Sequence, residues 1–374
     1  MTGYEKLFSE AWKNHKNILC IRLDNMGDVL MTQPAMRALK ESAQGRKITL
    51  LTSSAGSGIA AYIPEVDDII PFDVPWVKTS ETGGKQQLQA LADELASRRF
   101  DAAAIFTAYS QNPLPAAMLC YYAGIKPVLG YCRENPYELI NQWVPDKEPF
   151  DYVIHEVERQ LHLVGMAGGL TSDTRLSLEI PEESREKVSG RLAAIGIEPD
   201  EPWLVLHAGV SEEKRRYPAA EYITACRSLT RQGYKILLTG SGSERDYVDE
   251  IARPLSHAAT NIAGELSLAE LIALVAAAPV LISNNTGPVH IAAAVGTPVV
   301  VLYAMTNPQH TPWQVLNRVL YFEVLPELRT KNRLLQSFPG LATPRASPEA
   351  IEAAVNEFTG INNASKNYCT DSLV

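Results

Sequence analysis

Short β-branched runs alternate with longer helical stretches along this chain, and this alternation restricts the possible folds more than any other feature. Apolar spacing predicts strands and helices in two series. The predicted strands are Ile18–Leu23, Lys47–Thr52, Asp101–Thr107, Trp203–His207, Lys235–Thr239, Val280–Ser283 and Val299–Tyr303. The predicted helices are a segment ending near Ser42, Gln86–Ser97, Glu156–Met166, Ala219–Arg231, Arg245–Ala252, Leu268–Ala277 and Val289–Val295. Such alternation indicates an α/β fold with parallel sheets covered by helices on both faces.

A polar, Glu-rich stretch, Leu176–Arg191, separates the two series. A chain of 374 residues also exceeds the size at which a single core usually stops growing. We therefore expect a Rossmann-like N-terminal domain over 1–175 and a Rossmann-like C-terminal domain over 176–345. The last part, 346–374, should be a helix that returns to the N-terminal domain, followed by a frayed tail. Because open α/β sheets bind ligands at the carboxyl ends of their strands, functional residues are expected in the loops after the strands.

Composition excludes several classes of protein. The formal net charge of −9 argues against a nucleic-acid partner. The five cysteines are scattered without a CxxC pair, so neither a disulfide framework nor a zinc site is expected. Met1–Lys16 lacks the apolar run of a secretory signal, and the longest apolar runs are too short to span a bilayer. We expect a cytoplasmic protein whose membrane contact, if any, is peripheral; the oligomeric state cannot be read from the sequence.

The first functional motif follows the first predicted strand. A tight loop carries Asp24, Asn25 and Gly27, and Asp28 opens or precedes the next helix. Pro34 is awkward inside a helix, so either the helix is kinked there or it begins at Pro34. Asp28 has two interpretations. It is a helix N-cap, for which aspartate is favoured, or it is a catalytic base at the edge of the sheet.

The second motif runs from Val280 to Pro298. Pro288 suits the start of a helix, which places Thr286 or Gly287 near the cap, and Gly296 suits its end. A glycine at a helix N-terminus lets a diphosphate approach the backbone, so this motif favours anion binding. His290 lies one turn into the helix, and its structural alternative is a hydrogen bond to a neighbouring loop.

Three consecutive cations, Lys214, Arg215 and Arg216, lie between a predicted strand and the next helix. Such a run can hold a leaving diphosphate, where negative charge develops during group transfer. Glu212 and Glu213 dilute the positive charge, and a solvated loop is the alternative interpretation.

A glycine-containing loop, Gly240 to Glu244, follows another predicted strand. It lacks the full G-x-G-x-x-G pattern, because Arg245 stands where the third glycine would be. The loop is therefore poor support for a nicotinamide cofactor, although it suits the edge of a nucleotide site.

Together these motifs resemble glycosyltransferase family 9, the ADP-heptose:lipopolysaccharide heptosyltransferase family. Arg22–Asp28 with Pro34 resembles its N-terminal signature. The family's C-terminal signature is matched by a second set of residues in this chain, namely Thr286–His290, Gly296–Pro298, Asn307, Pro308 and Trp313, which resemble it. Gly209 with the cationic run resembles the family's phosphate-side loop. His155–Arg159 resembles the segment that leads towards its interdomain region, and Ser347–Phe358 resembles its final helix.

This resemblance implies a GT-B fold, in which two Rossmann-like domains face a central cleft. It implies metal-independent, inverting transfer from ADP-heptose or a related nucleotide sugar, without a cofactor. Asp28 would be the general base, and Arg215, or Lys214 by a shift of register, would hold the donor phosphate. Thr286 and Gly287 would contact the diphosphate. The acceptor would be a lipopolysaccharide core or another surface glycan, with possible peripheral contact with the inner membrane.

Asn285 stands where the family usually has aspartate facing the donor sugar, so the identity of that sugar stays open. The stretch Leu316–Pro344 matches nothing in the family. A sugar-nucleotide epimerase is the alternative enzyme, with Asp24, Asp28 and Glu134 as its candidate acid-base groups. A non-catalytic binding protein for sugar nucleotides or glycans is the alternative from another class, favoured by Asn285. A dehydrogenase is the weakest alternative.

Overall fold

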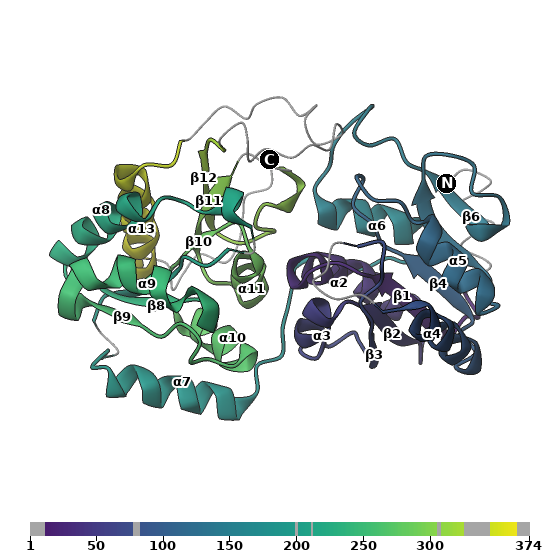
Figure 1. Ribbon diagram of the computed structural model, residues 1–374, viewed down its shortest axis with the longest axis horizontal. Coiled ribbons are helices and arrows are strands. Elements are labelled where there is room, and N and C mark those ends of the chain that lie inside the picture. The colour runs from purple at the N-terminus through teal and green to yellow at the C-terminus, as the bar shows by residue number, and fades with distance from the viewer. Residues whose placement is uncertain are drawn as a thin grey trace. The chain divides into compact units, whose positions relative to one another are not determined.

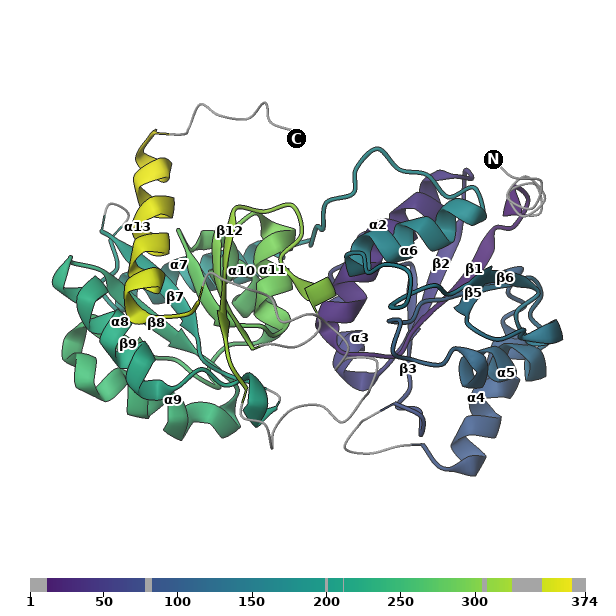
Figure 2. The ribbon, with the colours of Figure 1, turned by 90° about the horizontal axis from the view of Figure 1, so that it is seen from above.

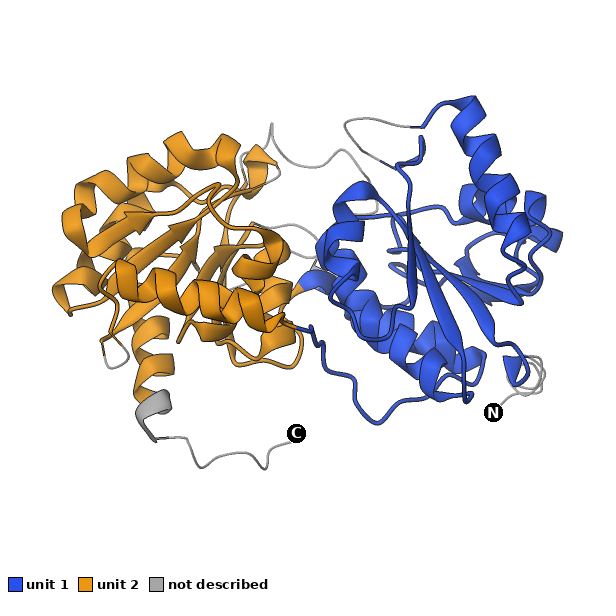
Figure 3. Cartoon of the chain, turned by 90° about the horizontal axis from the view of Figure 1, so that it is seen from below, with its two compact units in different colours: residues 1–179, 308–310 blue, residues 180–307, 311–374 orange. Residues whose placement is uncertain are grey.

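The chain, described here by a computed structural model, forms two compact units, each built on a six-stranded sheet. The structure describes residues 12–77, 83–198, 201–210, 212–304, 308–324 and 345–364. Unit 1 comprises residues 1–179 and 308–310, and unit 2 comprises residues 180–307 and 311–374 (Figure 3). The first unit therefore ends close to the expected boundary at 176. It also includes the short segment Pro308–His310, which the sequence did not indicate.

Unit 1 has the strand order β3-β2-β1-β4-β5-β6, and the paired strands are parallel. Its strands are β1 (Asn17–Arg22), β2 (Lys47–Thr52), β3 (Asp68–Pro71), β4 (Ala102–Ile105), β5 (Val128–Cys132) and β6 (Gln142–Pro145). Its helices are α2 (Met26–Glu41), α3 (Ser54–Ala60), α4 (Lys85–Ser97), α5 (Leu114–Tyr122) and α6 (Glu156–Met166), with the 3-10 turns η1 (Tyr137–Leu139) and η5 (Pro308–His310). Helices α2, α3 and α6 pack together, whereas α4 and α5 share a core with β1 (Figure 1).

The alternation of side chains along β1 determines the face of the sheet on which its last residue, Arg22, lies. Leu19 and Ile21 join the core that α4 and α5 cover. Because successive side chains of a strand point to opposite faces, Arg22 lies on the other face, where α2 and α6 pack. A charged side chain at the buried end of a central strand needs partners of opposite charge, and the first turns of these two helices supply them.

Unit 2 has the strand order β12-β11-β10-β7-β8-β9, again with parallel pairs. Its strands are β7 (Trp203–His207), β8 (Lys235–Thr239), β9 (Ala259–Asn261), β10 (Leu281–Asn284), β11 (Val299–Ala304) and β12 (Asn317–Phe322). Its helices are α7 (Glu182–Ala194), α8 (Ala219–Arg231), α9 (Arg245–Ala252), α10 (Leu268–Ala277), α11 (Gly287–Val295) and α13 (Pro348–Ala364), with 3-10 turns η2 (Glu213–Arg215), η3 (Gly242–Glu244) and η4 (Arg253–Ala258). Helices α8, α9 and α13 share one core with β7, while α10 contacts both α7 and α11.

Two local predictions about helix ends are settled by the backbone. Helix α2 begins at Met26 and continues through Pro34, so the alternative that the helix begins at Pro34 is wrong. Gly296 ends α11 with φ +79°, a left-handed conformation that glycine adopts without the penalty of a β-carbon. The prediction of Gly296 as the helix stop is therefore confirmed.

The last helix differs from its expected place. Ile351, Val355 and Phe358 of α13 are buried in the core of unit 2, and α13 contacts α8 (Figure 2). Within the described residues, α13 therefore belongs to the second unit, and not to the first as the sequence suggested. The apolar spacing predicted a buried helical face, but it carries no information about which core buries that face.

Several elements escaped prediction because their patterns are weak. Helix α7 is highly polar, and only Ser184 and Val188 are buried, so it lacks an apolar stripe. Strands β3 and β9 are only four and three residues long and lie at sheet edges. Short edge strands need few apolar residues, because one side of the ladder is open.

Candidate active site

Asp28 lies in the first turn of α2, directly beyond the carboxyl end of β1. The N-cap of α2 is Asn25, so the interpretation of Asp28 as an N-cap is wrong. Gly27 is buried beside Asp28, whereas Asn25 is exposed. Because the sheet order reverses between β1 and β4, Asp28 follows a strand at the switch point where open α/β sheets bind ligands.

A single buried guanidinium organises this end of unit 1. Arg22 is 0% exposed, and each of its three nitrogens contacts a different carboxylate. Its Nε lies 2.8 Å from Asp24, its Nη2 3.1 Å from Asp28, and its Nη1 2.6 Å from Glu156. The Asp28 side chain is 17% exposed, so its carboxylate is held in position and still reaches solvent. Three carboxylates against one cation leave an excess of negative charge, which favours uptake of a proton.

The other two carboxylates of this cluster titrate in opposite directions. Burial, with the negative charge of Asp28, raises the pKa of Asp24 to about 6, although the charge of Arg22 acts against this. Burial alone would also raise the pKa of Glu156, but the charge of Arg22, together with His310 and Arg159, outweighs it and holds that pKa well below the usual range. Glu156 therefore stays ionised near neutral pH, and Asp24 is a weaker acid than an ordinary aspartate.

Asp24 connects the cluster to the loop after β4. The side-chain amide of Gln111 donates a hydrogen bond from Nε2 to Asp24, and its Oε1 accepts one from the backbone N–H of Ala108. The loops after β1 and β4, the two strands at the switch point, are thereby joined. The structure brings Asp24 and Asp28 together around Arg22, while Asn25 makes no side-chain cap.

In unit 2 the candidate donor-binding residues follow the ends of three adjacent strands, β10, β7 and β8. Glu244 joins two of the loops, because its carboxylate accepts hydrogen bonds from the backbone of Val210 and of Ser241, each at 2.7 Å. A β-carbon at Gly209 would lie 2.4 Å from the Glu244 carboxylate, and one at Gly240 would lie 3.3 Å from it. Glycine at these two positions therefore allows the carboxylate to approach the backbone of both loops.

We expect Glu244→Gln to lower the stability of the protein by about 1–2 kcal/mol at pH 7, because backbone donors lose a charged acceptor. Burial would raise the pKa of Glu244, but hydrogen bonds from Ser241 and Val210 lower it below the usual value. A lowered pKa in the folded state means that this stabilisation is fully present above the unfolded pKa of about 4.3 and is lost as the pH falls through the folded value.

Urea unfolding at pH 7 and at acidic pH checks this prediction. The difference between wild type and Glu244→Gln should shrink as the pH falls through that range. The exposed Glu250 lies on α9, close in sequence to Glu244, and Glu250→Gln should match wild type at both pH values. A difference between Glu244→Gln and wild type that does not depend on pH would contradict the assignment.

The N-terminus of α11 supplies a second feature of unit 2. Thr286 is the N-cap but its side chain makes no capping hydrogen bond, and Gly287 and Pro288 open the helix. The first N–H groups of a helix are potential anion ligands, and the dipole favours negative charge there. Asn285 is buried just before this cap, and His290 is buried within the helix.

Buried Asn284 holds the cationic loop next to this helix. Its amide donates to the carbonyl of Ala208 at 2.8 Å and accepts from the backbone of Tyr217 at 3.0 Å. Lys214 and Arg215 lie in η2, which contacts β11, and both pair loosely with Glu212 at 3.2 and 3.4 Å. The third cation, Arg216, lies over the ring of Tyr247. The donor-side candidates after β7 and β10 are thus neighbours in unit 2.

Comparison with known proteins identifies the family. The family model described as glycosyltransferase family 9 (heptosyltransferase) matches residues 88–334. The chain belongs to this family. It is 26% identical to lipopolysaccharide heptosyltransferase 2 of Escherichia coli (strain K12) over 308 residues, which covers 79% of this chain and 84% of the relative. It is also 26% identical to lipopolysaccharide heptosyltransferase 1 of Pseudomonas aeruginosa over 298 residues, 79% of this chain and 80% of that relative.

Solved structures of family 9 proteins share the fold. A family 9 glycosyltransferase from Veillonella parvula matches with a TM-score of 0.75 at 18% identity, over 94% of this chain and 99% of that one. The ADP-heptose lps heptosyltransferase II of E. coli matches with a TM-score of 0.70 at 22% identity, over 93% and 99%. The predicted fold, GT-B with two Rossmann-like parallel-sheet domains, is confirmed, and the protein is a glycosyltransferase.

The range matched by the family model, residues 88–334, contains the donor-side loops of unit 2 but begins after Asp28. The role of Asp28 therefore depends on the geometry of unit 1. Sequence reasoning quoted Arg22 and Glu156 within motifs without giving them a role, and it missed His310. No short pattern relates residues 22, 156 and 310, because only the tertiary fold joins them. Asn307, part of the second resemblance, lies outside the described residues.

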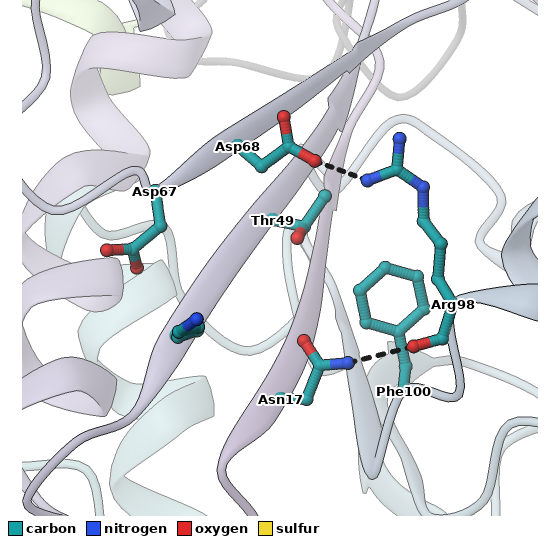
Figure 4. Close-up of a pocket in the computed structure, with 7 residues that line it drawn as sticks. Asn17, Thr49, Asp67, Asp68, Arg98 and Phe100 are labelled. Carbon is teal, nitrogen blue, oxygen red and sulfur yellow. Dashed lines mark hydrogen bonds and ion pairs between the residues drawn. The ribbon is translucent and has the colours of Figure 1, made fainter.

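This glycosyltransferase also has a pocket of about 510 Å³ in unit 1, at the end of the sheet opposite to the carboxyl ends of the strands. It lies at the amino ends of β1, β2 and β3 and includes Asn17, Lys47 and Asp68 (Figure 4). Its polar groups bind one another, since Arg98 pairs with Asp68 and its carbonyl accepts a hydrogen bond from Asn17 at 3.0 Å. We assign no function to this pocket.

Proposed function

We propose that this protein transfers a heptose or a related sugar from an ADP-sugar to a lipopolysaccharide core or another surface glycan. The sugar and the acceptor follow the printed names of its relatives, the lipopolysaccharide heptosyltransferases, and the ADP-linked donor follows the name of the solved E. coli ADP-heptose lps heptosyltransferase II. A further neighbour, E. coli heptosyltransferase WaaC, has been solved with ADP-2-deoxy-2-fluoro heptose, at 18% identity. The observation that carries the mechanism is the Asp28 carboxylate, fixed by Arg22 and partly open to solvent.

In this mechanism Asp28 takes the proton of the acceptor hydroxyl as that oxygen attacks the anomeric carbon of the donor. The bond between this carbon and the diphosphate breaks, and the nucleoside diphosphate leaves with the electron pair. A single displacement inverts the anomeric configuration. Lys214 or Arg215 and the N-terminus of α11 stabilise the charge of the leaving group, which is the role that a metal plays in other transferases.

A panel of ADP-, GDP- and UDP-sugars tests this proposal. Release of nucleoside diphosphate is followed by mass spectrometry with and without a heptose-accepting lipid A core. We expect ADP release that requires the acceptor. Turnover with UDP- or GDP-sugars alone would overturn the donor class, and hydrolysis that does not depend on any acceptor would overturn transfer. Asn285, where the family usually has aspartate, makes the choice of sugar within the ADP panel the informative comparison.

The two candidate phosphate ligands can be separated by single substitutions. We expect Lys214→Ala or Arg215→Ala to weaken ADP binding about 10- to 100-fold, because a charge-assisted hydrogen bond contributes roughly 1.5–3 kcal/mol. Calorimetric titration with ADP would show which side chain holds the phosphate. Arg253→Ala, which removes an exposed cation of the same unit, is the control and should bind ADP normally. Normal affinity in both loop variants would remove η2 from the donor site.

Peripheral membrane contact through unit 1 is also proposed, with the cytoplasmic face of the inner membrane as the location. No helix in the described ranges combines the length and apolar composition needed to cross a bilayer. Of the eight exposed large hydrophobic residues among those described, seven lie in unit 1: Met118, Tyr121, Tyr122, Tyr137, Phe150, Tyr152 and Leu170. Tyrosine suits the interface between water and lipid, because its ring is apolar and its hydroxyl polar.

Flotation with anionic liposomes at low salt checks this contact. The double variant Tyr121→Ser/Tyr122→Ser should bind at least about tenfold more weakly, since burying one large apolar side chain contributes roughly 1.5–3 kcal/mol. Leu316→Ser removes the eighth exposed residue, which lies in unit 2, and should leave binding unchanged. Wild-type protein that stays with the unbound fraction would refute the contact.

A further inference from the structure

His310 is a titratable residue beside Asp28 that the mechanism above does not use. It lies in η5, the segment Pro308–His310 that belongs to unit 1. Its Nε2 is 4.0 Å from Oδ1 of Asp28 and 3.9 Å from Oε2 of Glu156. Both this nitrogen and Glu156 Oε2 are buried without a hydrogen-bond partner among the described residues. The imidazole nitrogen thus lies about 4 Å from each of two carboxylates, a separation that a small rotation of the ring can shorten to a hydrogen bond.

The neighbouring residue fixes η5 in this place. Buried Gln309 donates hydrogen bonds to the Glu148 carboxylate at 2.7 Å and to the carbonyl of Ile154 at 2.8 Å. Glu148 is itself held by Arg159 at 2.6 Å, on the helix that begins with Glu156. Because His310 is 23% exposed, it is anchored on one side and reaches solvent on the other.

Charged groups from several elements surround His310. It faces Asp28 of α2 and Glu156 of α6, and Arg22 of β1 lies behind them with Asp24 as its third partner. Glu148 and Arg159 form a pair on the Gln309 side. An imidazolium next to two carboxylates is stabilised by both. The pKa of Glu156 lies well below its usual range, because Arg22, His310 and Arg159 together outweigh its burial, so Glu156 stays a carboxylate beside an imidazolium.

We propose that His310 accepts, at Nε2, the proton that Asp28 removes from the acceptor hydroxyl, with Glu156 as the counter-charge. This inference depends on the proposed role of Asp28. The acceptor O–H bond breaks and its proton forms a bond with an Asp28 oxygen while the new glycosidic bond forms. The proton then passes to Nε2, which restores the Asp28 carboxylate and leaves an imidazolium between Asp28 and Glu156. The imidazolium then releases one proton to solvent, and the neutral ring returns to the tautomer with Nε2 unprotonated, which restores the acceptor for the next cycle. His310 is therefore a positioning and relay residue that acts through Asp28.

The test compares His310→Gln and His310→Ala with wild type in the acceptor-dependent assay. Glutamine keeps polar atoms at this position but cannot carry the proton, so we expect kcat to fall about 100-fold, the lower end of what a placed acid-base group contributes. The KM for the donor should not change. Imidazole in solution should restore kcat of His310→Ala, whereas pyrazole, which has the same shape and is a much weaker base, should not.

The control is His257→Gln, an exposed histidine of unit 2, which should keep wild-type kcat. Wild-type kcat in His310→Gln, or equal rescue by imidazole and pyrazole, would overturn the relay. The two proposals fail differently. If Asp28→Asn stays active, the base assignment fails and the relay with it; if Asp28→Asn is inactive while His310→Gln is normal, only the relay fails.

Discussion

Asp28→Asn is expected to lower kcat by about 10²- to 10⁴-fold, because the amide keeps the shape of the side chain but cannot accept the proton of the acceptor hydroxyl. The Arg22 contact at 3.1 Å can be kept by the amide oxygen, so the fold should survive. Binding of the donor should be unaffected, since the donor candidates lie in the other unit. Acceptor-dependent ADP release under saturating substrate measures kcat, and calorimetry measures ADP affinity.

Asp93→Asn is the matched control for this substitution. Asp93 is an exposed residue of α4 in the same unit, so the same chemical change away from the cluster should leave kcat unchanged. An Asp28→Asn enzyme with more than about a tenth of wild-type kcat would contradict general-base catalysis by Asp28, since a placed base contributes at least about 10²-fold. Loss of ADP binding in the variant would instead indicate a change in the fold.

The second large effect is expected on stability. Arg22→Met should lower the stability of the protein by about 3–5 kcal/mol, because it leaves the fully buried Glu156 without its counter-charge. Asp24 and Asp28 lose the same partner, although both can still be reached by water. The midpoint of urea unfolding, followed by circular dichroism, should fall accordingly, and kcat should fall with it as Asp28 loses its orientation.

A second substitution separates the lost charge balance from lost packing. Arg22→Met/Glu156→Leu removes both buried charges, and an apolar pair in place of a buried ion pair is often close to neutral. We therefore expect the double variant to recover most of the lost stability but not the activity. Arg98→Met, which breaks a partly exposed pair with Asp68 and Glu94, should cost at most about 1 kcal/mol. A double variant as unstable as Arg22→Met would show that packing, and not charge, is the cause.

Much of the fold could be predicted because the strands and helices follow from apolar patterns within short segments of the sequence. The strands Lys47–Thr52, Trp203–His207 and Lys235–Thr239 lie at their predicted bounds, and so does the helix Glu156–Met166. In a parallel sheet both faces are covered, so a strand is a continuous apolar run that is easily recognised. The edge strands and α7 were missed because they bury few side chains.

The candidate donor-binding loops could also be predicted from the sequence, because each loop is formed by one continuous segment of the chain. The strand, Thr286, Gly287, Pro288 and the helix form one continuous segment whose turn chemistry places the helix N-terminus. The role of Glu244 was not accessible in the same way. Its carboxylate holds two loops that follow different strands, and the need for Gly209 appears only when the carboxylate is seen beside it.

The sequence by itself determined that this is a two-domain α/β protein with functional loops after its strands, because the periods of strands and helices and the residues of turns act locally. It also placed Asp28 at the end of the first strand. Only the tertiary structure decided that Asp28 is held by Arg22 rather than capping its helix, and that Glu156 and His310 surround it. Glu156 and His310 are far from Asp28 in the chain, and they approach it because α2, α6 and η5 pack beside one strand, where buried charges must be paired.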